Sequence, residues 1–366
     1  MERYIGLMSG TSADGIDAVI AEFAEGRFQR LTASHHRPHP AELRSALIAL
    51  GRNSEAQISL SAFAGLDVAL ARGFAAAALG VMQIAGLTAK DIRALGSHGQ
   101  TIFHEPKRLG SSIQLGDPNH IAALTGLPVV ADFRRMDVAL GGEGAPLVPA
   151  FHAALFSSTV PTAVVNIGGI ANVTLLPETA RGEVRGYDCG PGNALMDEWA
   201  TRHLGSAYDH GGRFAAQGNI LPMLLSNWLA EPYFALAPPK STGRSLFNLE
   251  WADALAEGDL AQYAPADVQA TLCELTATTI CEAIPSNTQR MLICGGGAFN
   301  AHLMRRIEVL KPSANIASTE IAGLAPQWVE AAAFAWLAHQ RIHQLPGNLP
   351  SVTGASRLAV LGGLYG

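Results

Sequence analysis

The sequence has no excess of basic residues. Its 366 residues include 25 Lys and Arg against 31 Asp and Glu, a formal net charge of −6. Proteins that bind the phosphate backbone of nucleic acids need clustered Lys and Arg, so we do not expect nucleic acid as the main partner. A small anionic ligand remains compatible with this charge, because a few backbone amides and one or two Arg can hold it.

Cysteine and long apolar runs are also scarce. The four cysteines, at positions 189, 273, 281 and 294, form no C-x-x-C pair. They predict no disulfide framework and suit a reducing cytoplasm. The first residues lead straight into an apolar strand, so we expect no signal peptide. No charge-free apolar run has membrane-spanning length, and the longest, Ala75 to Leu87, predicts a buried helix rather than a membrane partner.

The phosphate loop G-x-x-x-x-G-K-[ST] is absent from the whole sequence. A nucleotide would therefore have to be held in another way. The length predicts two domains, and a hydrophobic content of 48% is enough for substantial cores.

The chain opens with two apolar runs around a polar turn, from Tyr4 to Phe23. This pattern predicts strand, tight turn and strand. Glycines let the backbone approach a ligand, hydroxyls and amides can hold an anion, and carboxylates suit a phosphate that arrives with a divalent metal. An ordinary hairpin with a polar tip is the alternative. The candidate phosphate-binding residues are Ser9, Gly10, Thr11, Ser12, Ala13, Asp14 and Gly15, and the candidate metal ligands are Asp14 and Asp17.

Two further Gly-rich turns follow later in the chain. The pattern of strand, turn and strand recurs from Thr162 to Leu176, which suggests one domain design used twice with a cleft between the copies. A strand from Met291 to Cys294 then runs through a glycine turn into a helix that ends at Leu310, an arrangement typical of nucleotide binding but weak alone. The candidate ligand-binding residues in these turns are Asn166, Gly168, Gly169, Gly295, Gly296, Gly297 and Asn300.

Polar clusters follow predicted strands at 96–101, 114–118 and 131–137. Ligands of α/β folds bind at the carboxyl ends of strands, so three clusters together favour a polar ligand such as a sugar, although each alone could be a solvated loop. The candidate sugar-binding residues here are His98, Gln100, Thr101, Asp117, Arg134 and Asp137. His35, His36 and His39 stand among prolines, and we interpret them as a surface loop rather than a metal site.

Two carboxylates are candidates for direct roles in chemistry. A predicted strand ends at Asp188, just before the rigid turn Gly190-Pro191-Gly192, which favours a fixed general base over a simple cap of the turn or helix. Glu330 opens a predicted helix and could point into the cleft. The alternative is a favourable charge on the helix dipole.

The three Gly-rich elements resemble the phosphate-1, phosphate-2 and adenosine elements of the sugar kinase, heat-shock protein and actin superfamily. Four segments more specifically resemble the anhydro-N-acetylmuramic acid kinase family, namely 6–17, 96–101, 166–172 and 188–193. Two positions depart from the family pattern: Ala13 stands where Leu is usual, and Cys189 where Thr is usual. Neither change removes a functional carboxylate or hydroxyl.

The resemblance implies an α/β, two-domain, actin-like ATPase fold made of duplicated RNase H-like domains with a central interdomain cleft. We expect one domain at 1–145 with the tail 351–366, and the other at 146–350. It also implies an enzyme that uses ATP and Mg²⁺ to phosphorylate O6 of 1,6-anhydro-N-acetylmuramic acid, a peptidoglycan turnover product, while water opens the anhydro bridge at C1. The product is N-acetylmuramic acid 6-phosphate. A cytoplasmic homodimer is implied as well.

Matching the family motif, Asp188 would activate the water. Arg134, Asp137 and Glu330 would hold the sugar or its lactyl carboxylate, with Arg134 the natural partner of the carboxylate. Two alternatives remain. A different sugar or carboxylate kinase of the superfamily would lack the polar clusters at 96–101 and 131–137, and a non-catalytic sugar-binding regulator would need a DNA-binding module, for which we find no basic helix–turn–helix extension.

Overall fold

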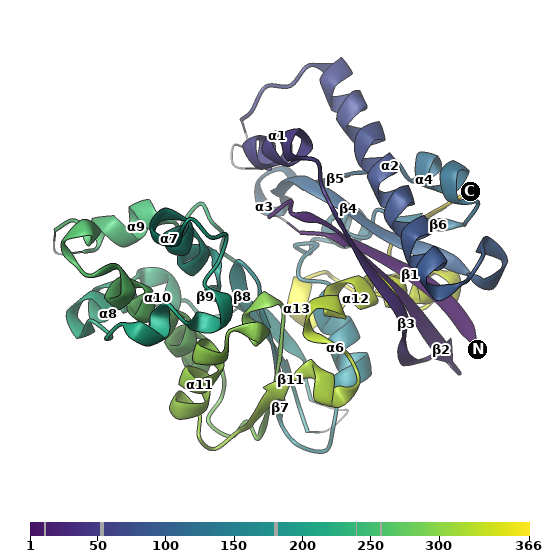
Figure 1. Ribbon diagram of the computed structural model, residues 1–366. Helices are drawn as coiled ribbons and strands as arrows, with labels where there is room; N and C mark the ends of the chain where they lie inside the picture. Colours follow the sequence, from purple (N-terminus) through teal and green to yellow (C-terminus); the bar gives the residue numbers. More distant parts are fainter. Residues whose placement is uncertain (11, 52–54, 179–181, 239, 257) are drawn as a thin grey trace. The chain divides into compact units, whose positions relative to one another are not determined.

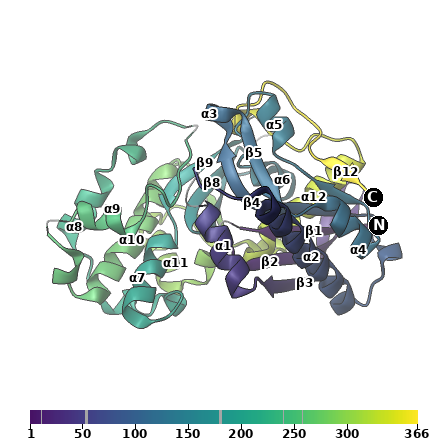
Figure 2. The ribbon, with the colours of Figure 1, turned by 90° about the horizontal axis from the view of Figure 1, so that it is seen from above.

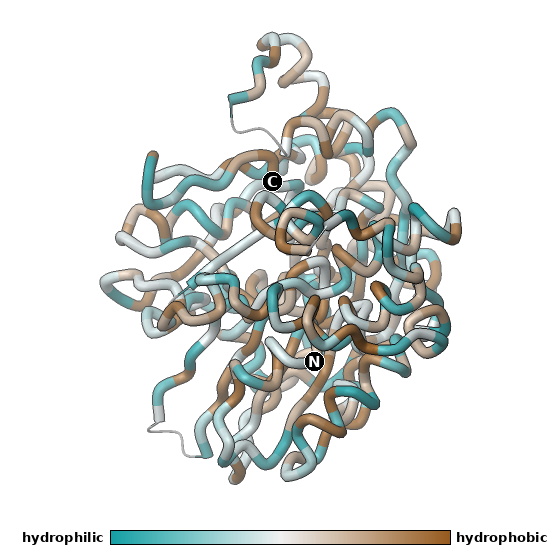
Figure 3. The backbone as a smooth tube through the Cα atoms, turned by 90° about the vertical axis from the view of Figure 1, so that its left-hand side faces the viewer, coloured by the Kyte–Doolittle hydropathy of each residue, from teal (hydrophilic) through white to brown (hydrophobic). Residues whose placement is uncertain are grey.

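The computed structural model describes residues 1–366 except 11, 52–54, 179–181, 239 and 257 (Figure 1). It divides into two compact units, which we call unit 1 (Met1–Leu155 with Trp328–Gly366) and unit 2 (Phe156–Gln327). Hydrophobic and hydrophilic segments are interspersed along the backbone (Figure 3). Each unit is built on its own β-sheet.

The sheet of unit 1 has the strand order β12-β6-β4-β1-β2-β3, with β5 paired to β4. The first three strands form an antiparallel meander, and β4 and β6 run parallel to β1. The strands are β1 (Glu2–Ser9), β2 (Gly15–Ala24), β3 (Arg27–Pro38), β4 (Ala94–Glu105), β5 (Ser111–Leu115), β6 (Val129–Ala131) and β12 (Gly363–Tyr365).

The sheet of unit 2 repeats this plan with the order β11-β10-β7-β8-β9. Three antiparallel strands again come first, and the two later strands run parallel to the first of them. The strands are β7 (Thr162–Ile167), β8 (Ile170–Leu176), β9 (Arg185–Pro191), β10 (Arg290–Cys294) and β11 (Asn315–Ser318). The repeated topology confirms the predicted duplicated α/β fold.

Two long helices cover opposite faces of the sheet of unit 1: α2 (Leu60–Ala85) and α12 (Val329–Ile342) (Figures 1 and 2). The other helices of this unit are α1 (Ala41–Gly51), α3 (Pro106–Leu109), α4 (Pro118–Thr125), α5 (Arg135–Ala139), α6 (Val148–Phe156), α13 (Pro350–Thr353) and the 3-10 helices η1 (Ala89–Asp91) and η8 (Pro326–Trp328), of which α6 and η8 end or begin at the boundary with unit 2.

Helix α2 is the one helix among the described residues with the length and composition to cross a membrane, with a mean hydropathy of 1.6 over its most apolar window. Its buried side chains, including Phe74 and Val81, belong to the same core cluster as Ile5 and Ile16 of the sheet. This packing favours a core helix, as the sequence predicted for part of it.

Helix α12 lies unusually close to the sheet because two strands carry glycine where it crosses. A Cβ atom on Gly6 would be 1.9 Å from the carbonyl oxygen of Ala331, and one on Gly96 would be 2.1 Å from that of Phe334. The predicted boundary at 350 therefore needs correction, because α12 packs with unit 1 rather than with the second domain. The first boundary also shifts, from 145 to 155.

The helices of unit 2 are α7 (Ala194–Leu204), α8 (Pro222–Leu229), α9 (Leu249–Ala254), α10 (Pro265–Ala283) and α11 (Ala301–Leu310), with the 3-10 helices η2 (His210–Gly212), η3 (Ala215–Gln217), η4 (Pro232–Ala235), η5 (Leu260–Gln262), η6 (Gly296–Phe299) and η7 (Thr319–Ala322). Helix α10 is the most deeply buried of these, and its side chains Leu272, Leu275 and Ile280 lie in the core cluster of this unit.

Candidate functional site

The turn between β1 and β2 is held in place by hydrogen bonds from buried polar side chains. Ser9 Oγ lies 2.6 Å from Gln100 Oε1, 2.8 Å from the Gly15 carbonyl oxygen and 3.1 Å from His39 Nε2. Gln100 Nε2 donates to the Gly10 carbonyl oxygen at 3.1 Å. Gln100, expected to bind a sugar, and Ser9, expected to bind phosphate, therefore set the shape of the turn. His39 is buried here, so it is not part of a surface loop.

The remaining turn residues are partly open. Ala13 is buried with a positive φ of 51°, and its amide donates to the Gly10 carbonyl oxygen at 3.1 Å. This closes a tight turn with Ser12 partly exposed beside it. Thr11, one of the predicted phosphate-binding residues, lies outside the described residues.

The two candidate metal ligands differ in their partners. Asp14 is exposed and accepts hydrogen bonds from Arg44 Nε at 3.1 Å and Nη2 at 2.8 Å. Asp17 Oδ1 lies 2.7 Å from Nδ1 of His36, which belongs to strand β3 rather than to a loop. Burial raises the pKa of Asp17, and the Asp14 charge adds to this, in opposition to His36. A divalent cation would relieve the unfavourable charge, and carboxylate oxygens suit Mg²⁺.

Arg134 joins two of the predicted polar clusters of unit 1. Its Nη2 and Nε atoms lie 2.7 and 3.1 Å from His98 Nε2, and Nη1 donates to the Gly144 carbonyl oxygen at 2.7 Å. Burial, and then the Arg134 charge, lower the pKa of His98 well below its usual value, so the ring is neutral and Nε2 accepts. Burial lowers the pKa of Arg134 to about 10, which still leaves it charged at neutral pH.

Glu330, in the first turn of α12, belongs to the same cluster. Burial raises the pKa of its carboxyl group, the charge of Asp17 raises it further, and the charge of Arg134 opposes both. Asp17, Arg134 and Glu330 thus interact electrostatically within unit 1. The close approach of α12 to β1 at Gly6 brings Glu330 to this position.

Asp137 has a different role from the one predicted. Its side chain is fully buried, and Oδ1 accepts hydrogen bonds from Asn348 Nδ2 and Thr353 Oγ1, both at 2.8 Å. Oδ2 accepts from the amide of Gly144 at 2.8 Å. A carboxylate with no exposed surface cannot reach a sugar, so this expectation is corrected. Asp137 anchors the C-terminal segment to the loop at Gly144, whose carbonyl oxygen accepts a hydrogen bond from Arg134.

Two other predicted sugar-binding residues form hydrogen bonds with neighbouring residues of unit 1. Asp117 caps α4 by accepting from the amide of Asn119 at 2.9 Å, and it pairs with His120. Thr101 Oγ1 accepts from Gln114 Nε2 at 3.3 Å. Gln114 and Asp117 also line a cavity of about 430 Å³ between β5 and the start of α2, a volume large enough for a monosaccharide.

In unit 2, the turn between β7 and β8 is braced by the segment after Asp188. The amides of Gly192 and Asn193 donate to the carbonyl oxygens of Gly169 and Gly168 at 2.9 and 2.8 Å, and Asn193 Nδ2 donates to that of Ile167 at 3.0 Å. A Cβ atom on Gly192 would be 2.3 Å from the Gly168 carbonyl oxygen. The glycine at 192 is therefore needed for the close approach of the two turns.

The third Gly-rich turn meets the same end of β7. A Cβ atom on Gly295, where φ is 77°, would be 2.4 Å from Asn166 Oδ1, and one on Gly297 would be 2.3 Å from Ile167 Cγ2. Gly296 remains exposed. Asn300 caps α11, because its Oδ1 accepts from the amide of Leu303 at 3.0 Å. All three Gly-rich segments of unit 2 thus surround Asn166 and Ile167.

Asp188 lies within β9 rather than at its end, which corrects the predicted strand end. The pairing of β8 with β9 shifts register beside it. Its Oδ2 accepts from the amide of Thr242 at 3.0 Å, its carbonyl oxygen accepts from the Tyr233 hydroxyl at 2.9 Å, and its amide donates to the Lys240 carbonyl oxygen at 3.2 Å. The carboxylate is partly exposed and its orientation is set by a neighbouring loop.

That loop contains a functional candidate that the sequence did not indicate to us. A Cβ atom on Gly169 would lie 3.2 Å from Arg244 Nη2, so the exposed guanidinium lies directly beside the turn at Gly168-Gly169. The only sequence feature that could have indicated Arg244 is its position next to a glycine, in Thr242-Gly243-Arg244. Lys240, in the same loop, is partly buried and donates to the carbonyl oxygens of Tyr233 and Phe234 at 3.2 and 3.0 Å.

Comparison with known proteins places this geometry in a family. The chain is 49% identical to a protein named anhydro-N-acetylmuramic acid kinase from Variovorax paradoxus, covering 100% of this chain and 99% of that protein. Proteins of the same name from Saccharophagus degradans and Coxiella burnetii are 48% and 46% identical, covering 99% and 100% of this chain and 98% and 97% of theirs.

Solved structures are more distant. Component A of (R)-2-hydroxyglutaryl-CoA dehydratase from Acidaminococcus fermentans aligns with a TM-score of 0.48 at 12% identity, covering 94% of this chain and 100% of that chain. The family model for anhydro-N-acetylmuramic acid kinase, by contrast, matches residues 2–366. The chain belongs to the anhydro-N-acetylmuramic acid kinase family.

Proposed function

We propose that this enzyme uses ATP to phosphorylate O6 of 1,6-anhydro-N-acetylmuramic acid and adds water to C1 as the anhydro ring opens. The product is N-acetylmuramic acid 6-phosphate, and the role is recycling of peptidoglycan and degradation of its amino sugar. Family membership over residues 2–366 supports the kinase activity. The observation that carries the ring-opening step is the oriented carboxylate of Asp188, whose Oδ2 accepts from the Thr242 amide at 3.0 Å.

The phosphates of ATP would be held by backbone amides and one cation. The turn between β1 and β2 is kept in shape by Ser9 and Gln100, and the turn at Gly168-Gly169 by Gly192. Arg244 stands beside the latter turn, where a guanidinium can neutralise charge that builds up during transfer. Such preorganised donors are the main contribution a protein makes to phosphoryl transfer.

Mg²⁺ is the metal that this chemistry requires, and Asp17 fits it best. Its pKa is raised by burial and by Asp14, so a bound divalent cation would favour its ionised form. Asp14 is already paired with Arg44 and contributes mainly through its charge. When bound with ATP, Mg²⁺ supplies neutralisation of the phosphate charge.

Asp188 would act as a general base toward water, as in inverting glycoside hydrolysis. Water attacks C1 and gives its proton to the carboxylate, the bond from C1 to O6 breaks, and the electron pair on O6 attacks the γ-phosphorus as ADP leaves. The γ-phosphoryl group captures O6, so no strong general acid is needed.

Arg134 and Glu330 would hold the sugar. The neutral ring of His98 and the Gly144 carbonyl oxygen orient the guanidinium of Arg134, which makes it the natural partner of the lactyl carboxylate. Glu330, at the start of α12, would accept from a sugar hydroxyl. The raised pKa of its carboxyl group favours the protonated form, which could also donate a hydrogen bond.

Product mass analysis tests the proposal. Purified protein, ATP, Mg²⁺ and the anhydro sugar should give a product that gains both phosphate and water, and Asp188→Asn should make almost none. Asparagine can still accept from the Thr242 amide, so the variant should fold. Glu198→Gln, which removes an exposed charge on α7 of the same unit, is the matched control and should be fully active. A product that gains phosphate without water would refute the role of Asp188.

We also propose a cytoplasmic location and a homodimer. All four cysteines are free thiols and buried, as suits a reducing compartment. Fractionation of the native host would test the location. Light scattering coupled to gel filtration would test the assembly, since a dimer of a 38.4 kDa chain is easily separated from a monomer.

A further inference from the structure

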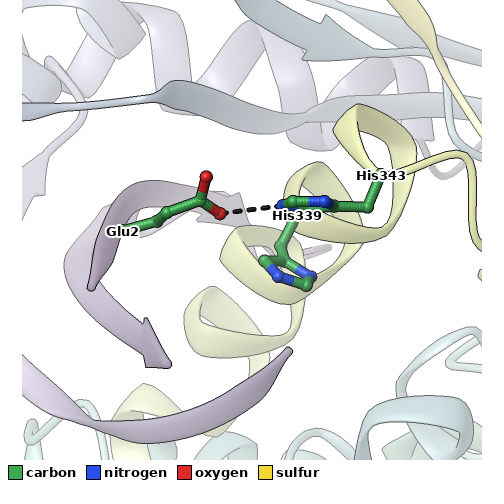
Figure 4. A group of neighbouring side chains, drawn as sticks. All are labelled: Glu2, His339 and His343. Carbon is green, nitrogen blue, oxygen red and sulfur yellow. Dashed lines mark hydrogen bonds and ion pairs between the residues drawn. The ribbon is translucent and has the colours of Figure 1, made fainter. Parts of the chain in front are cut away.

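Glu2, His339 and His343 lie together at one edge of unit 1 (Figure 4). Glu2 begins β1, whereas Ser9 ends it. His339 lies in the last turn of α12 and His343 caps that end, whereas Glu330 lies in the first turn. The cluster is therefore at the opposite ends of both elements from the residues assigned to phosphate and sugar. The proposed kinase reaction makes no use of it.

The donor atoms of this cluster converge. One carboxylate oxygen of Glu2 and one nitrogen of each imidazole all lie within 4.8 Å of one another. The shortest of these distances that is resolved joins Glu2 Oε2 to His343 Nε2, at 2.8 Å. The amide of His343 donates to the His339 carbonyl oxygen at 3.0 Å, so the helical turn continues and both imidazoles leave it on the same side. Two histidines one turn apart on a helix are a common arrangement for binding a metal.

Neighbouring groups orient these donors. The Tyr4 hydroxyl donates to Glu2 Oε2 at 3.1 Å. His339 is buried, its ring stacks on Phe23 at 4.7 Å, and its Nδ1 lies 3.2 Å from Gln340 Oε1. A proton on Nδ1 directed at Gln340 leaves the lone pair of Nε2 for a ligand. Metal-binding histidines usually have such an oxygen partner on the other ring nitrogen.

We propose that Glu2, His339 and His343 bind one Zn²⁺ ion, with water as the fourth ligand. Two imidazoles and a carboxylate are a known zinc ligand set, whereas Mg²⁺ prefers oxygen donors throughout. Zinc–nitrogen bonds of about 2.0–2.1 Å place tetrahedral ligand atoms about 3.3 Å apart. The most widely spaced ligand atoms, up to 4.8 Å apart, must therefore move closer by up to about 1.5 Å, which the 41% exposed side chain of His343 allows. The ion would fasten the beginning of β1 to the end of α12 and stabilise unit 1.

Zinc titration of the metal-free full chain tests this site. Isothermal titration with ZnCl₂ should give one ion per chain and a higher unfolding midpoint, and Co²⁺ should give the visible absorption of a tetrahedral site. His343→Ala and Glu2→Gln should each weaken zinc binding at least tenfold and remove the rise in midpoint, since even the loss of an orienting partner typically costs 10- to 100-fold. MgCl₂ should not displace Co²⁺ from the site, and any effect of MgCl₂ on the midpoint should be the same in the wild type and in His343→Ala.

His120→Ala is the matched control, because His120 forms an exposed pair with the carboxylate of Asp117 but belongs to no group of three possible metal ligands among the described residues. This variant should bind zinc like the wild type. Equal zinc affinity in wild type, His343→Ala and Glu2→Gln would overturn the proposal, and so would the absence of stoichiometric binding at micromolar zinc. His339→Ala is avoided because its buried ring is also part of the core. The kinase assay tests the proposed function separately, because none of these zinc-binding results depends on kinase activity.

Discussion

Arg134 donates to a single acceptor through two nitrogens: Nη2 and Nε lie 2.7 and 3.1 Å from His98 Nε2. A third N–H group, on Nη1, goes to the Gly144 carbonyl oxygen. Since a guanidinium has five N–H groups, these three bonds leave two, one on each Nη atom, with which it can bind a carboxylate in a bidentate manner.

Replacing Arg134 with Lys should therefore impair sugar binding selectively. An ammonium group keeps the charge but cannot bond His98, Gly144 and a carboxylate with one planar fork. We expect KM for the anhydro sugar to rise roughly 10- to 100-fold, the effect of losing one charged hydrogen-bonded contact of about 1.5–3 kcal/mol, with KM for ATP unchanged. Steady-state kinetics measure both. Arg108→Lys, at an exposed pair with Glu105, is the control, and a rise in KM for ATP instead would contradict the assignment.

Glu330→Gln should make the protein more stable but less active. Burial and Asp17 raise the pKa of Glu330, so the folded state disfavours its ionised form. Below the pKa of the unfolded state, about 4.5, Glu330 is protonated in both states, and as pH rises from there through the raised folded-state pKa the wild type loses stability that the neutral variant keeps. At pH 7.5 the variant should therefore unfold at a higher temperature than the wild type, by about 2–4 °C for each kcal/mol gained in a domain of this size. Its activity should fall at least tenfold.

Thermal unfolding of both proteins between pH 4.5 and pH 8 gives the measurement for Glu330. The difference in midpoint should grow with pH. Glu308→Gln, an exposed carboxylate on α11, should show no such growth. A variant less stable than the wild type across this range would show that the carboxylate is ionised and favourably paired.

Gly6→Ala should damage unit 1, because the added methyl group would meet the backbone of α12 1.9 Å away. Backbone cannot rotate aside, so we expect a loss of at least about 2–3 kcal/mol in the free energy of unfolding. Urea denaturation of the variant measures it. Gly65→Ala, on the open side of α2 with no atom within 4 Å of the new carbon, should be neutral or more stable by about 0.5–1 kcal/mol. Equal stability of the two variants would mean that α12 can move away from the sheet.

Arg244→Gln should raise KM for ATP and lower kcat, because the guanidinium beside Gly169 would no longer neutralise phosphate. A tenfold or larger loss in kcat/KM is expected for a cation that acts on the transferring phosphoryl group. Arg213→Gln removes another exposed arginine of unit 2 and serves as the control. Unchanged kinetics in Arg244→Gln, at ionic strengths from 0.05 to 0.3 M, would show that Arg244 does not take part in binding ATP or transferring its phosphate.

Local patterns predicted much of this protein correctly. Alternating apolar runs around Gly-rich turns indicated both hairpins, and the repeated design indicated a duplicated fold, because strand periodicity and turn chemistry are encoded by near neighbours in the chain. The same patterns misplaced the end of β9, since a register shift in the pairing of β8 with β9 lets the strand continue past Asp188. The second domain predicted from these patterns also began too early, before α6, and ended too late, after α12.

Residue identity and spacing by themselves determined the family, the two hairpins and the candidate base. Only the tertiary structure decided which polar side chains remain available to a ligand. Asp137 and Gln100 looked like sugar contacts in sequence, but their partners lie up to 216 positions away, at Thr353, or across the sheet, at Gly10. Glu2 and His343 are 341 positions apart and meet because α12 packs on β1. Hydrogen-bond partners so distant along the chain leave no local signal, because their meeting depends on how whole elements pack.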